Sequence, residues 1–355
     1  MASSGKPTMA DVARAAGVSS ATVSRVLRGE EGASSAKTRA RVLACAAELG
    51  YIVNGVASSM RSRQTRSVGL VIADVSNPWF GQLAAGVENV LGPAGFSVIL
   101  ANTDNSVERE RKAVQALLQK QVDALVVASS SADGEHLQHV VARGTPMVLV
   151  DAELPDLEAD SIAIDNEAAA RTATEHLLDA GHVDIAIVAG GPGPASDRAR
   201  LAGYTQALAD RGLPVRPEYV SSGAATYDGG RQAVAGLLAL PQRPSAIFGT
   251  NNLMTMGALV AIAEAGLEIP ADISIVGIDD MEWYAIASPA ITVVHESATE
   301  IGQRAAERVL LRLRRKRQLP PERVLLATEF RRRGSVGPPP VDLVGDTRRQ
   351  ALGSR

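Results

Sequence analysis

The chain has 355 residues, of which 46% are hydrophobic and 21% charged, and its formal net charge is −3. These values predict two or three folded domains and exclude wholesale disorder, while the single Cys45 excludes a disulfide framework or a thiolate metal cluster. No apolar run approaches the ~18 residues of a membrane span, and no hydrophobic segment at the N-terminus suggests a secretion signal, so we expect a soluble cytoplasmic protein.

Charge is distributed unevenly along the chain. Residues 1–66 hold ten basic and four acidic side chains, a net +6, whereas the remaining residues hold 26 basic and 35 acidic ones, a net −9. A basic head before an acidic body predicts that the head meets a polyanion and the body does not. A merely solvated basic surface is the alternative that charge alone leaves open.

The first fifty residues predict three short helices. Thr8 opens the first in a Thr-x-x-Asp pattern, and Gly17 ends it because glycine supplies the positive φ of a tight turn. Ser19 can cap a second helix that reaches about Leu27, and a third runs from about residue 36 to residue 49. Two helices joined by a short glycine turn on a basic segment predict a DNA-binding helix-turn-helix, with any small three-helix core as the alternative. We expect inward positions for Val12, Ala16, Val18, Val23 and Leu27, and for Leu43, Ala46 and Ala47 in the third helix.

Ordered motifs in this head resemble a known family. The matching stretches are Thr-Met-Ala-Asp-Val-Ala at 8–13, Ala-Gly-Val-Ser at 16–19, Thr-Val-Ser-Arg-Val-Leu at 22–27, Ser-Ala-Lys-Thr-Arg at 35–39 and Leu-Gly-Tyr at 49–51. Together they are similar to the DNA-binding head of the lactose-repressor/purine-repressor (LacI/GalR) family of bacterial transcription regulators. The resemblance implies that the second helix lies in the major groove of operator DNA.

The resemblance also implies individual DNA contacts. Ser20, Ala21 and Arg25 would read base edges, and the Arg25 guanidinium could grip guanine O6 and N7 for ~1–3 kcal/mol of discrimination. Phosphate contacts, which position the protein, are implied for Ser19, Thr22, Ser24, Lys37 and Arg39, and Thr8 is also expected at the DNA. For Thr22 the alternative is a role in helix packing.

Residues 54–66 resemble the hinge helix of the same family, of which two copies in a dimer enter the minor groove. Met60 stands where family members commonly carry a leucine wedge, and Ala57 lies one turn earlier on the same face. Asn54 is also expected at the DNA, and Arg61, Arg63 and Arg66 would hold phosphates. An ordinary flexible tether is the alternative.

From Ser67 onward, apolar runs of strand length alternate with helical stretches. Such runs indicate parallel strands covered on both faces, and their repetition in two series predicts two doubly wound α/β lobes. The runs span 67–74, 96–102, 124–129 and 146–151 in the first series, and 184–190, 246–250, 273–279 and 291–295 in the second, with a last strand expected at 325–330.

The expected fold class is therefore α/β, with a three-helix helix-turn-helix head before a two-lobed body of parallel sheets. The resemblance implies that this body is like a periplasmic binding protein. We expect the head at 1–53, the hinge at 54–66, the body at 67–335 and a disordered tail at 336–355. Within the body, the first lobe would take about 67–165 and 295–323, and the second lobe about 166–294 and 324–335.

Polar residues fall at the carboxyl ends of several strands, where open α/β sheets bind ligands. Arg200, Asn251 and Asp279 are assigned by resemblance as binders of sugar hydroxyls, and Trp79 and Phe80 as stacking walls, with packing under the first helix as the alternative for the aromatic pair. Ala225 and Asn252 depart from the family, whose members often have an aromatic residue and an aspartate there. The expected effector site comprises Asp74, Asn77, Trp79, Phe80, Arg198, Arg200, Asn251 and Asp279.

These observations predict a transcription regulator, and specifically a repressor, controlled by a small polar effector. A homodimer would bind double-stranded operator DNA, and a sugar, a sugar phosphate or another polar metabolite would bind in the cleft. We expect no catalytic residues, no metal site, no cofactor and no membrane partner. The alternative is a solute-binding protein or a sugar-processing enzyme with the same two lobes.

Overall fold

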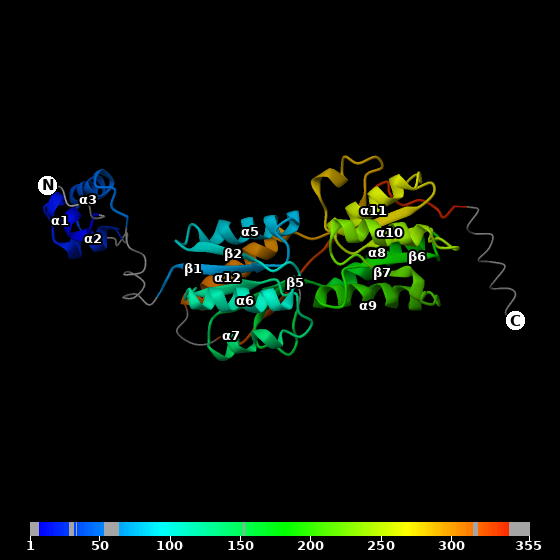
Figure 1. Ribbon diagram of the computed structural model, residues 1–355, viewed down its shortest axis with the longest axis horizontal. Helices are drawn as coiled ribbons and strands as arrows, with labels where there is room; N and C mark the ends of the chain where they lie inside the picture. Colours follow the sequence, from blue (N-terminus) through cyan, green and yellow to red (C-terminus); the bar gives the residue numbers. More distant parts are fainter. Residues whose placement is uncertain are drawn as a thin grey trace. The chain divides into compact units, whose positions relative to one another are not determined.

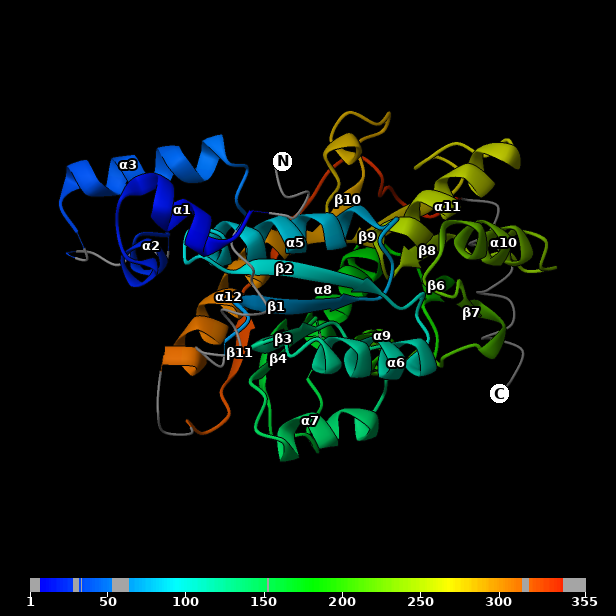
Figure 2. The same cartoon turned by 60° about the vertical axis from the view of Figure 1, so that its left-hand side comes forward.

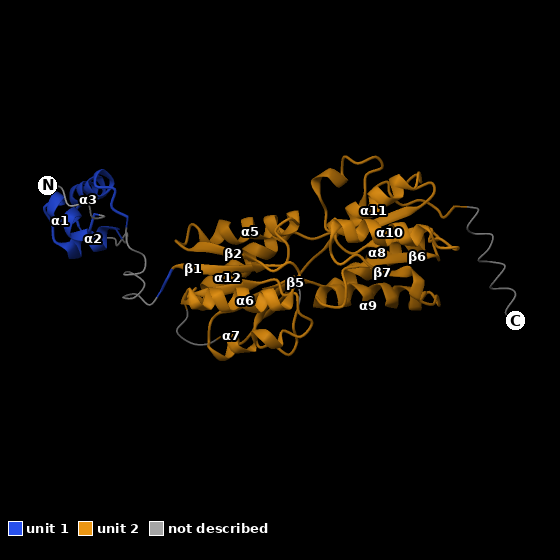
Figure 3. Ribbon diagram, viewed as in Figure 1, with its two compact units in different colours: residues 1–65 blue, residues 66–355 orange. Residues whose placement is uncertain are grey.

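The computed structural model (Figure 1) describes residues 7–27, 32, 34–52, 64–151, 153–314 and 319–340. The chain divides into two compact units, residues 1–65 and residues 66–355 (Figure 3). Most of the expected hinge, including Asn54, Ala57, Met60 and Arg61, lies outside the described residues. Every helix within the described ranges is too short or too polar to span a membrane.

The described residues of unit 1 form three helices, α1 (Met9–Ala16), α2 (Ser20–Leu27) and α3 (Ala36–Glu48). Thr8 caps α1 in a reciprocal capping box with Asp11, and Gly17 ends the helix with a φ of 62°. Ser19 caps α2, because its Oγ accepts a hydrogen bond of 3.1 Å from the Thr22 amide. The sequence prediction of three helices with these caps is confirmed.

The core of unit 1 differs from the prediction on α3. Val12, Ala16 and Val23 are buried as expected, and they meet Val42 and Ala46. Leu43 and Ala47, predicted to face inward, are exposed instead. Leu43 follows Val42 and Ala47 follows Ala46, and successive residues of a helix are rotated by about 100°. When Val42 and Ala46 face the core, Leu43 and Ala47 therefore face away from it.

The first lobe of unit 2 is a parallel sheet with helices on both faces. Alternate residues of a strand point to opposite faces, so Leu70 packs toward α5 and α12 while Val71 packs toward α6 and α7. Figures 1 and 2 show α5 and α6 on opposite sides of β1 and β2. In spatial order the strands are β11 (Arg323–Leu326), β5 (Asp160–Ile164), β4 (Met147–Val150), β3 (Ala124–Val127), β1 (Ser67–Ile72) and β2 (Ser97–Asn102). The helices are α5 (Pro78–Leu91), α6 (Val107–Gln119), α7 (Gln138–Ala142) and α12 (Ala298–Arg314), with a 3-10 turn at Glu135–Leu137.

The second lobe repeats this plan, except that its edge strand β12 runs antiparallel to β10. Helices α8 and α9 cover one face of the sheet, and α10 and α11 cover the other. In spatial order the strands are β12 (Glu329–Arg331), β10 (Thr292–His295), β9 (Ser274–Ile278), β8 (Ala246–Gly249), β6 (Ile185–Ala189) and β7 (Val220–Ser222). The helices are α8 (Asn166–Asp179), α9 (Ala195–Asp210), α10 (Tyr227–Leu238) and α11 (Asn252–Glu264), with 3-10 turns at Pro217–Tyr219 and Glu282–Tyr284.

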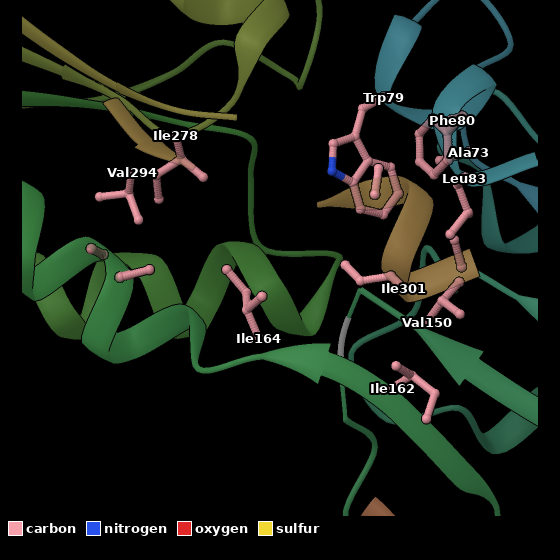
Figure 4. Packing of buried hydrophobic residues seen from close by; sticks show 14 of the residues in the cluster. Ala73, Trp79, Phe80, Leu83, Val150, Ile162, Ile164, Ile278, Val294 and Ile301 are labelled. Atoms are coloured by element: carbon pink, nitrogen blue, oxygen red, sulfur yellow. The ribbon is translucent and has the colours of Figure 1, made fainter. Parts of the chain in front are cut away.

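The chain crosses between the lobes after β5, after β10 and between β11 and β12. The single last strand predicted at 325–330 is wrong, because two short strands stand there, one in each sheet. Ala327 and Thr328 form the crossing, so the boundary between the lobes falls after β11 and not at residue 323. One hydrophobic cluster includes Ile164, Ile278 and Ile301, and it therefore continues from one lobe into the other (Figure 4).

Two further expectations about packing are wrong. The strand β2 lies at the edge of its sheet and its residues are exposed or half-buried, although its apolar run predicted cover on both faces. The segment after β12 is not a free tail at Val336 and Gly337, because the Gly337 amide donates to Ser274 Oγ at 3.1 Å and Val336 packs on the core. Backbone hydrogen bonding to the second lobe holds a segment whose composition suggested disorder. Residues 341–355 lie outside the described ranges.

Candidate functional site

The exposed face of α2 is the candidate DNA-reading surface. Ser20, Ala21 and Arg25 are all exposed, while Val23 and Val26 on the opposite face enter the core. Burial of the valines against α1 and α3 fixes the rotation of α2 about its axis. The exposed face of α2 therefore carries two short side chains in its first turn, and the long side chain of Arg25 follows one turn later.

The other predicted DNA contacts of the head fall into two groups. Lys37 and Arg39 are exposed in the first turn of α3. Thr8, Ser19 and Thr22 use their hydroxyls locally, since Thr8 Oγ1 donates to Asp11 Oδ2 at 2.6 Å and the Ser19 and Thr22 hydroxyls lie 2.9 Å apart. Half-buried Thr22 thus helps to close the start of α2, which supports the packing alternative for that residue. Ser24 is half-buried on the same helix.

A second candidate site is a cavity between the lobes of unit 2. In each sheet the strand order reverses direction next to the first strand, between β1 and β3 and between β6 and β8, which is where doubly wound sheets bind ligands. The cavity lies at the carboxyl ends of these strands. Its lining includes seven of the eight predicted effector residues, namely Asp74, Asn77, Trp79, Phe80, Arg200, Asn251 and Asp279.

Arg198 is the predicted residue that points elsewhere. It is exposed, and its Nη2 donates a hydrogen bond of 2.6 Å to the Ala132 carbonyl. Residues two apart on a helix stand about 200° apart around its axis, so α9 can turn only one of Arg198 and Arg200 into the cavity. A sugar phosphate was considered as a ligand because two arginines were expected in the site. Only one of them, Arg200, lines the cavity.

Arg200 is buried at the centre of the site. Its Nε donates to Asn166 Oδ1 at 2.8 Å and its Nη1 to the Thr250 carbonyl at 2.6 Å. Its Nη2 faces Asp151 at 3.6 Å and Glu296 at 3.9 Å. Burial alone would lower the pKa of Arg200, but the surrounding carboxylates, Asp151 first, raise it above the ordinary arginine value, so the guanidinium stays charged.

Acidic side chains outnumber this one cation. Burial raises the pKa of Asp197 to about 6 and also raises the pKa of Asp151, with the charge of Asp279 adding to the rise at both. Burial together with the Asp279 carboxylate raises the pKa of Glu296 well above its ordinary value. Asp151 and Asp279 also adopt positive φ angles of 72° and 69° directly after β4 and β9. Such strained backbone is typical of functional sites.

Trp79 and Phe80 contribute to the cavity wall and to the core at once. Their rings meet edge to face with centroids 5.0 Å apart, and they are 4% and 8% exposed. Figure 4 shows the pair beside Ala73 and Leu83 of the first lobe. Asn77, which caps α5, receives a hydrogen bond of 2.8 Å from Asn252 of the second lobe. Asn251 caps α11 by accepting from the Met254 amide.

Sequence reasoning missed several lining residues, among them Ser129, Ser130, Asp151 and Glu296. Each follows an apolar run at 124–129, 146–151 or 291–295, or ends it, so the strand-end rule that found Asp74 would have found them as well. Buried Glu110 holds part of this wall in place, because its carboxylate accepts hydrogen bonds from Ser129 Oγ and from the Ser130 amide.

Comparisons with known proteins show which families the two parts of the chain match. Residues 8–54 match the family model described as bacterial regulatory proteins, lacI family, and residues 65–331 match that of periplasmic binding proteins and sugar binding domain of LacI family. Catabolite control protein A of Priestia megaterium is 36% identical over 83% of this chain and 89% of its own length. The ribose operon repressor of Escherichia coli (strain K12) is 33% identical over 93% of this chain and 99% of its own length. A solved structure of the lac repressor dimer bound to operator and the anti-inducer ONPF is 30% identical, with a TM-score of 0.81 over 94% of this chain and 100% of that one.

Proposed function

The chain belongs to the LacI family of bacterial regulatory proteins, which are DNA-binding transcription regulators and not enzymes, and from this premise we propose how its two sites act. We propose a repressor whose α2 reads operator DNA and whose interlobe cavity senses a small polar effector. The observation that carries the proposal is that one chain joins an exposed helix-turn-helix surface to a buried polar cavity at the strand ends of two lobes.

On the DNA, Arg25 supplies a bidentate donor for guanine, and the small Ser20 and Ala21 let α2 approach the base edges closely. Lys37 and Arg39 contact phosphates, while Thr8, Ser19, Thr22 and Ser24 support the approach of α2. Ala57 and Met60 contribute minor-groove contacts, Arg61 holds a phosphate and Asn54 also contacts the DNA when two chains bind a pseudo-palindromic site as a homodimer. Since this target is genomic DNA in a bacterium, the protein works in the cytoplasm.

In the cavity, Arg200, Asn251 and Asp279 bind hydroxyl groups of a sugar or sugar derivative, and Trp79 and Phe80 offer an apolar edge to its C–H surface. Asp74 and Asn77 complete the first-lobe side of the wall. A phosphorylated ligand would be disfavoured there, because a single guanidinium is set among several carboxylates. Effector binding and operator binding are then coupled by about 1–3 kcal/mol, the usual range for allosteric proteins.

An operator selection with the purified full chain tests the DNA part of the proposal. We expect enrichment of a pseudo-palindromic site from random duplexes, and an enriched pool with no shared sequence would contradict it. Addition of sugars to the selected complex then tests the effector part, since one class should change operator affinity by roughly fivefold or more.

Arg200→Lys tests the location of the effector site. Lysine keeps the charge but loses the fork that reaches Asn166 and the Thr250 carbonyl together, so the effector response should disappear while operator affinity without effector stays unchanged. Arg198→Lys, one half-turn away on α9 and exposed, is the matched control and should respond normally. A normal response in Arg200→Lys would show that the effector binds elsewhere.

A further inference from the structure

The charge of the interlobe cavity is strongly unbalanced. One guanidinium, that of Arg200, lines it against five carboxyl groups, those of Asp74, Asp151, Asp197, Asp279 and Glu296. Both the Nε and the Nη1 of Arg200 are committed to Asn166 and Thr250, so this cation has only its Nη2 to offer the acids. Burying several carboxyl groups has a desolvation cost, and the single nearby cation is not enough to offset it.

Glu296 has the least support among these acids. Its side chain is 1% exposed, no donor among the described residues reaches either carboxylate oxygen, and the side chain within hydrogen-bonding range is another acid, Asp279. Its nearest cation is the Arg200 Nη2 at 3.9 Å, which is beyond hydrogen-bond distance. Asp279 shares the deficit, because its Oδ2 accepts a bond of 3.3 Å from the Asn252 amide while its Oδ1 has no partner in the described chain.

The fold brings these two carboxyl groups together. Asp279 directly follows β9 and Glu296 directly follows β10, and the two strands are parallel neighbours whose register pairs Val294 with Ile278. Both side chains therefore leave the same edge of the second-lobe sheet, and both line the cavity opposite Trp79 and Asn77 of the first lobe. Three acceptor oxygens without donors thus lie on two neighbouring acids that both line the cavity.

Resting on the proposed function, we propose that the effector carries a primary ammonium group, as an amino sugar does, and that Glu296 and Asp279 bind this group. An ammonium ion has three N–H donors and a full positive charge, so it can donate to the three oxygens that lack a donor and can replace the proton that the Glu296–Asp279 pair holds. Arg200 and Asn251 remain available at the cavity wall for the hydroxyl groups of the same ligand.

Other ligand classes fit these groups less well. A phosphate would bring negative charge to buried carboxylates and would meet one guanidinium. A neutral sugar would satisfy hydrogen bonds but would not offset the repulsion between the Asp279 and Glu296 carboxyl groups, which contributes to the raised pKa of Glu296. A divalent metal ion needs a larger ligand set, and among the described residues no three His, Cys, Asp or Glu side chains are grouped to hold one.

Calorimetric titration of the full chain with matched sugars tests the inference. The probes are 2-amino-2-deoxy and 6-amino-6-deoxy hexoses, each compared with its neutral parent hexose and its N-acetyl derivative. We expect at least one amino sugar to bind tenfold or more tightly than its neutral parent, and the N-acetyl form to lose that advantage. Equal or weaker binding of every amino sugar would overturn the inference while leaving a neutral-sugar effector intact.

Glu296→Gln gives the specificity readout. The variant keeps the shape and loses the carboxylate charge, so the ratio of amino-sugar affinity to parent-hexose affinity should fall at least tenfold. Glu300→Gln, exposed on α12 and equal in charge change, should retain the preference. An unchanged preference in Glu296→Gln would overturn the role of this residue. Operator binding measured on the same samples reports folding and tests the DNA function separately, so a failure of one proposal is distinguishable from a failure of the other.

Discussion

Arg25 is the one long side chain that α2 presents beside Ser20 and Ala21 on its exposed face. We expect Arg25→Ala to relax the preference at one base pair of each half-site, with a loss of about 1–3 kcal/mol of discrimination, because alanine cannot bridge guanine O6 and N7. A binding-site selection repeated with the variant measures this directly. Arg14→Ala removes an equal charge from α1, where Arg14 pairs with Asp11, and should leave the selected sequence unchanged.

Asp197 provides a pH test of the buried carboxyl cluster. Burial raises its pKa from 3.8 to about 6, against the attraction of Arg200 and with the repulsion of Asp151 and Asp279. The folded chain then holds this proton more tightly than the unfolded chain, so this group lowers the free energy of unfolding as pH rises from about 4 to about 6.

Asp197→Asn should remove that penalty. The free energy of unfolding of the variant, relative to that of the unaltered protein, should rise by up to about 3 kcal/mol from pH 4 to pH 7.5. This is the free energy that corresponds to roughly two pKa units. Urea unfolding of both proteins at the two pH values gives the difference. Groups such as Asp160 and Asp280, whose pKa values are lowered within arginine pairs, titrate alike in both proteins and cancel. A difference that did not change with pH would contradict the assignment.

At the scale of helices and strands, local signals were sufficient in some places and not in others. The helices of the head were predictable because Thr8, Gly17 and Ser19 carry their capping chemistry in the sequence itself. The division of 325–330 into two strands was not, since the choice of sheet depends on partners more than 150 residues away in β5. Which of Arg198 and Arg200 faces the cavity depends on the rotation of α9, which tertiary packing fixes.

The close packing of helices α5 and α12 is a tertiary constraint that could not be predicted from the sequence. A Cβ added at Gly86 of α5 would lie 2.2 Å from the Thr299 carbonyl oxygen, so the two helices approach too closely for a side chain there. Gly86→Ala should therefore lower the free energy of unfolding by about 1–3 kcal/mol, the usual range for overpacking.

Gly81→Ala on the same helix is the matched control for this prediction. A Cβ at Gly81 meets nothing within 4 Å, and alanine is the better helix former by roughly 0.5–1 kcal/mol, so this variant should be as stable as the parent or more so. Thermal or denaturant unfolding should show a loss of stability for Gly86→Ala and no loss for Gly81→Ala. A stabilised Gly86→Ala would mean that α5 and α12 are free to move apart.

At the scale of the whole chain, the separation of charge assigns the two ligands to different units. A head of +6 attracts DNA, while a body of −9 is repelled by it, so nonspecific attachment through the body is suppressed. The body in turn collects its own carboxylates in the cavity, where a cationic ligand would be favoured. The sequence predicted this division from composition alone, but the identity of the cavity wall required the fold.

Salt dependence tests the role of the basic head. Each neutralised phosphate releases counterions, so the logarithm of operator affinity should fall linearly with the logarithm of salt concentration, with a slope of about −0.9 per contact. Lys37→Gln should make that slope shallower by about one unit for each protomer bound and should weaken all sequences alike, because a phosphate contact carries no base information. Arg25→Ala should instead change the selected sequence. If Lys37→Gln altered base preference while leaving the slope unchanged, Lys37 would have to be reassigned from the phosphate backbone to the bases.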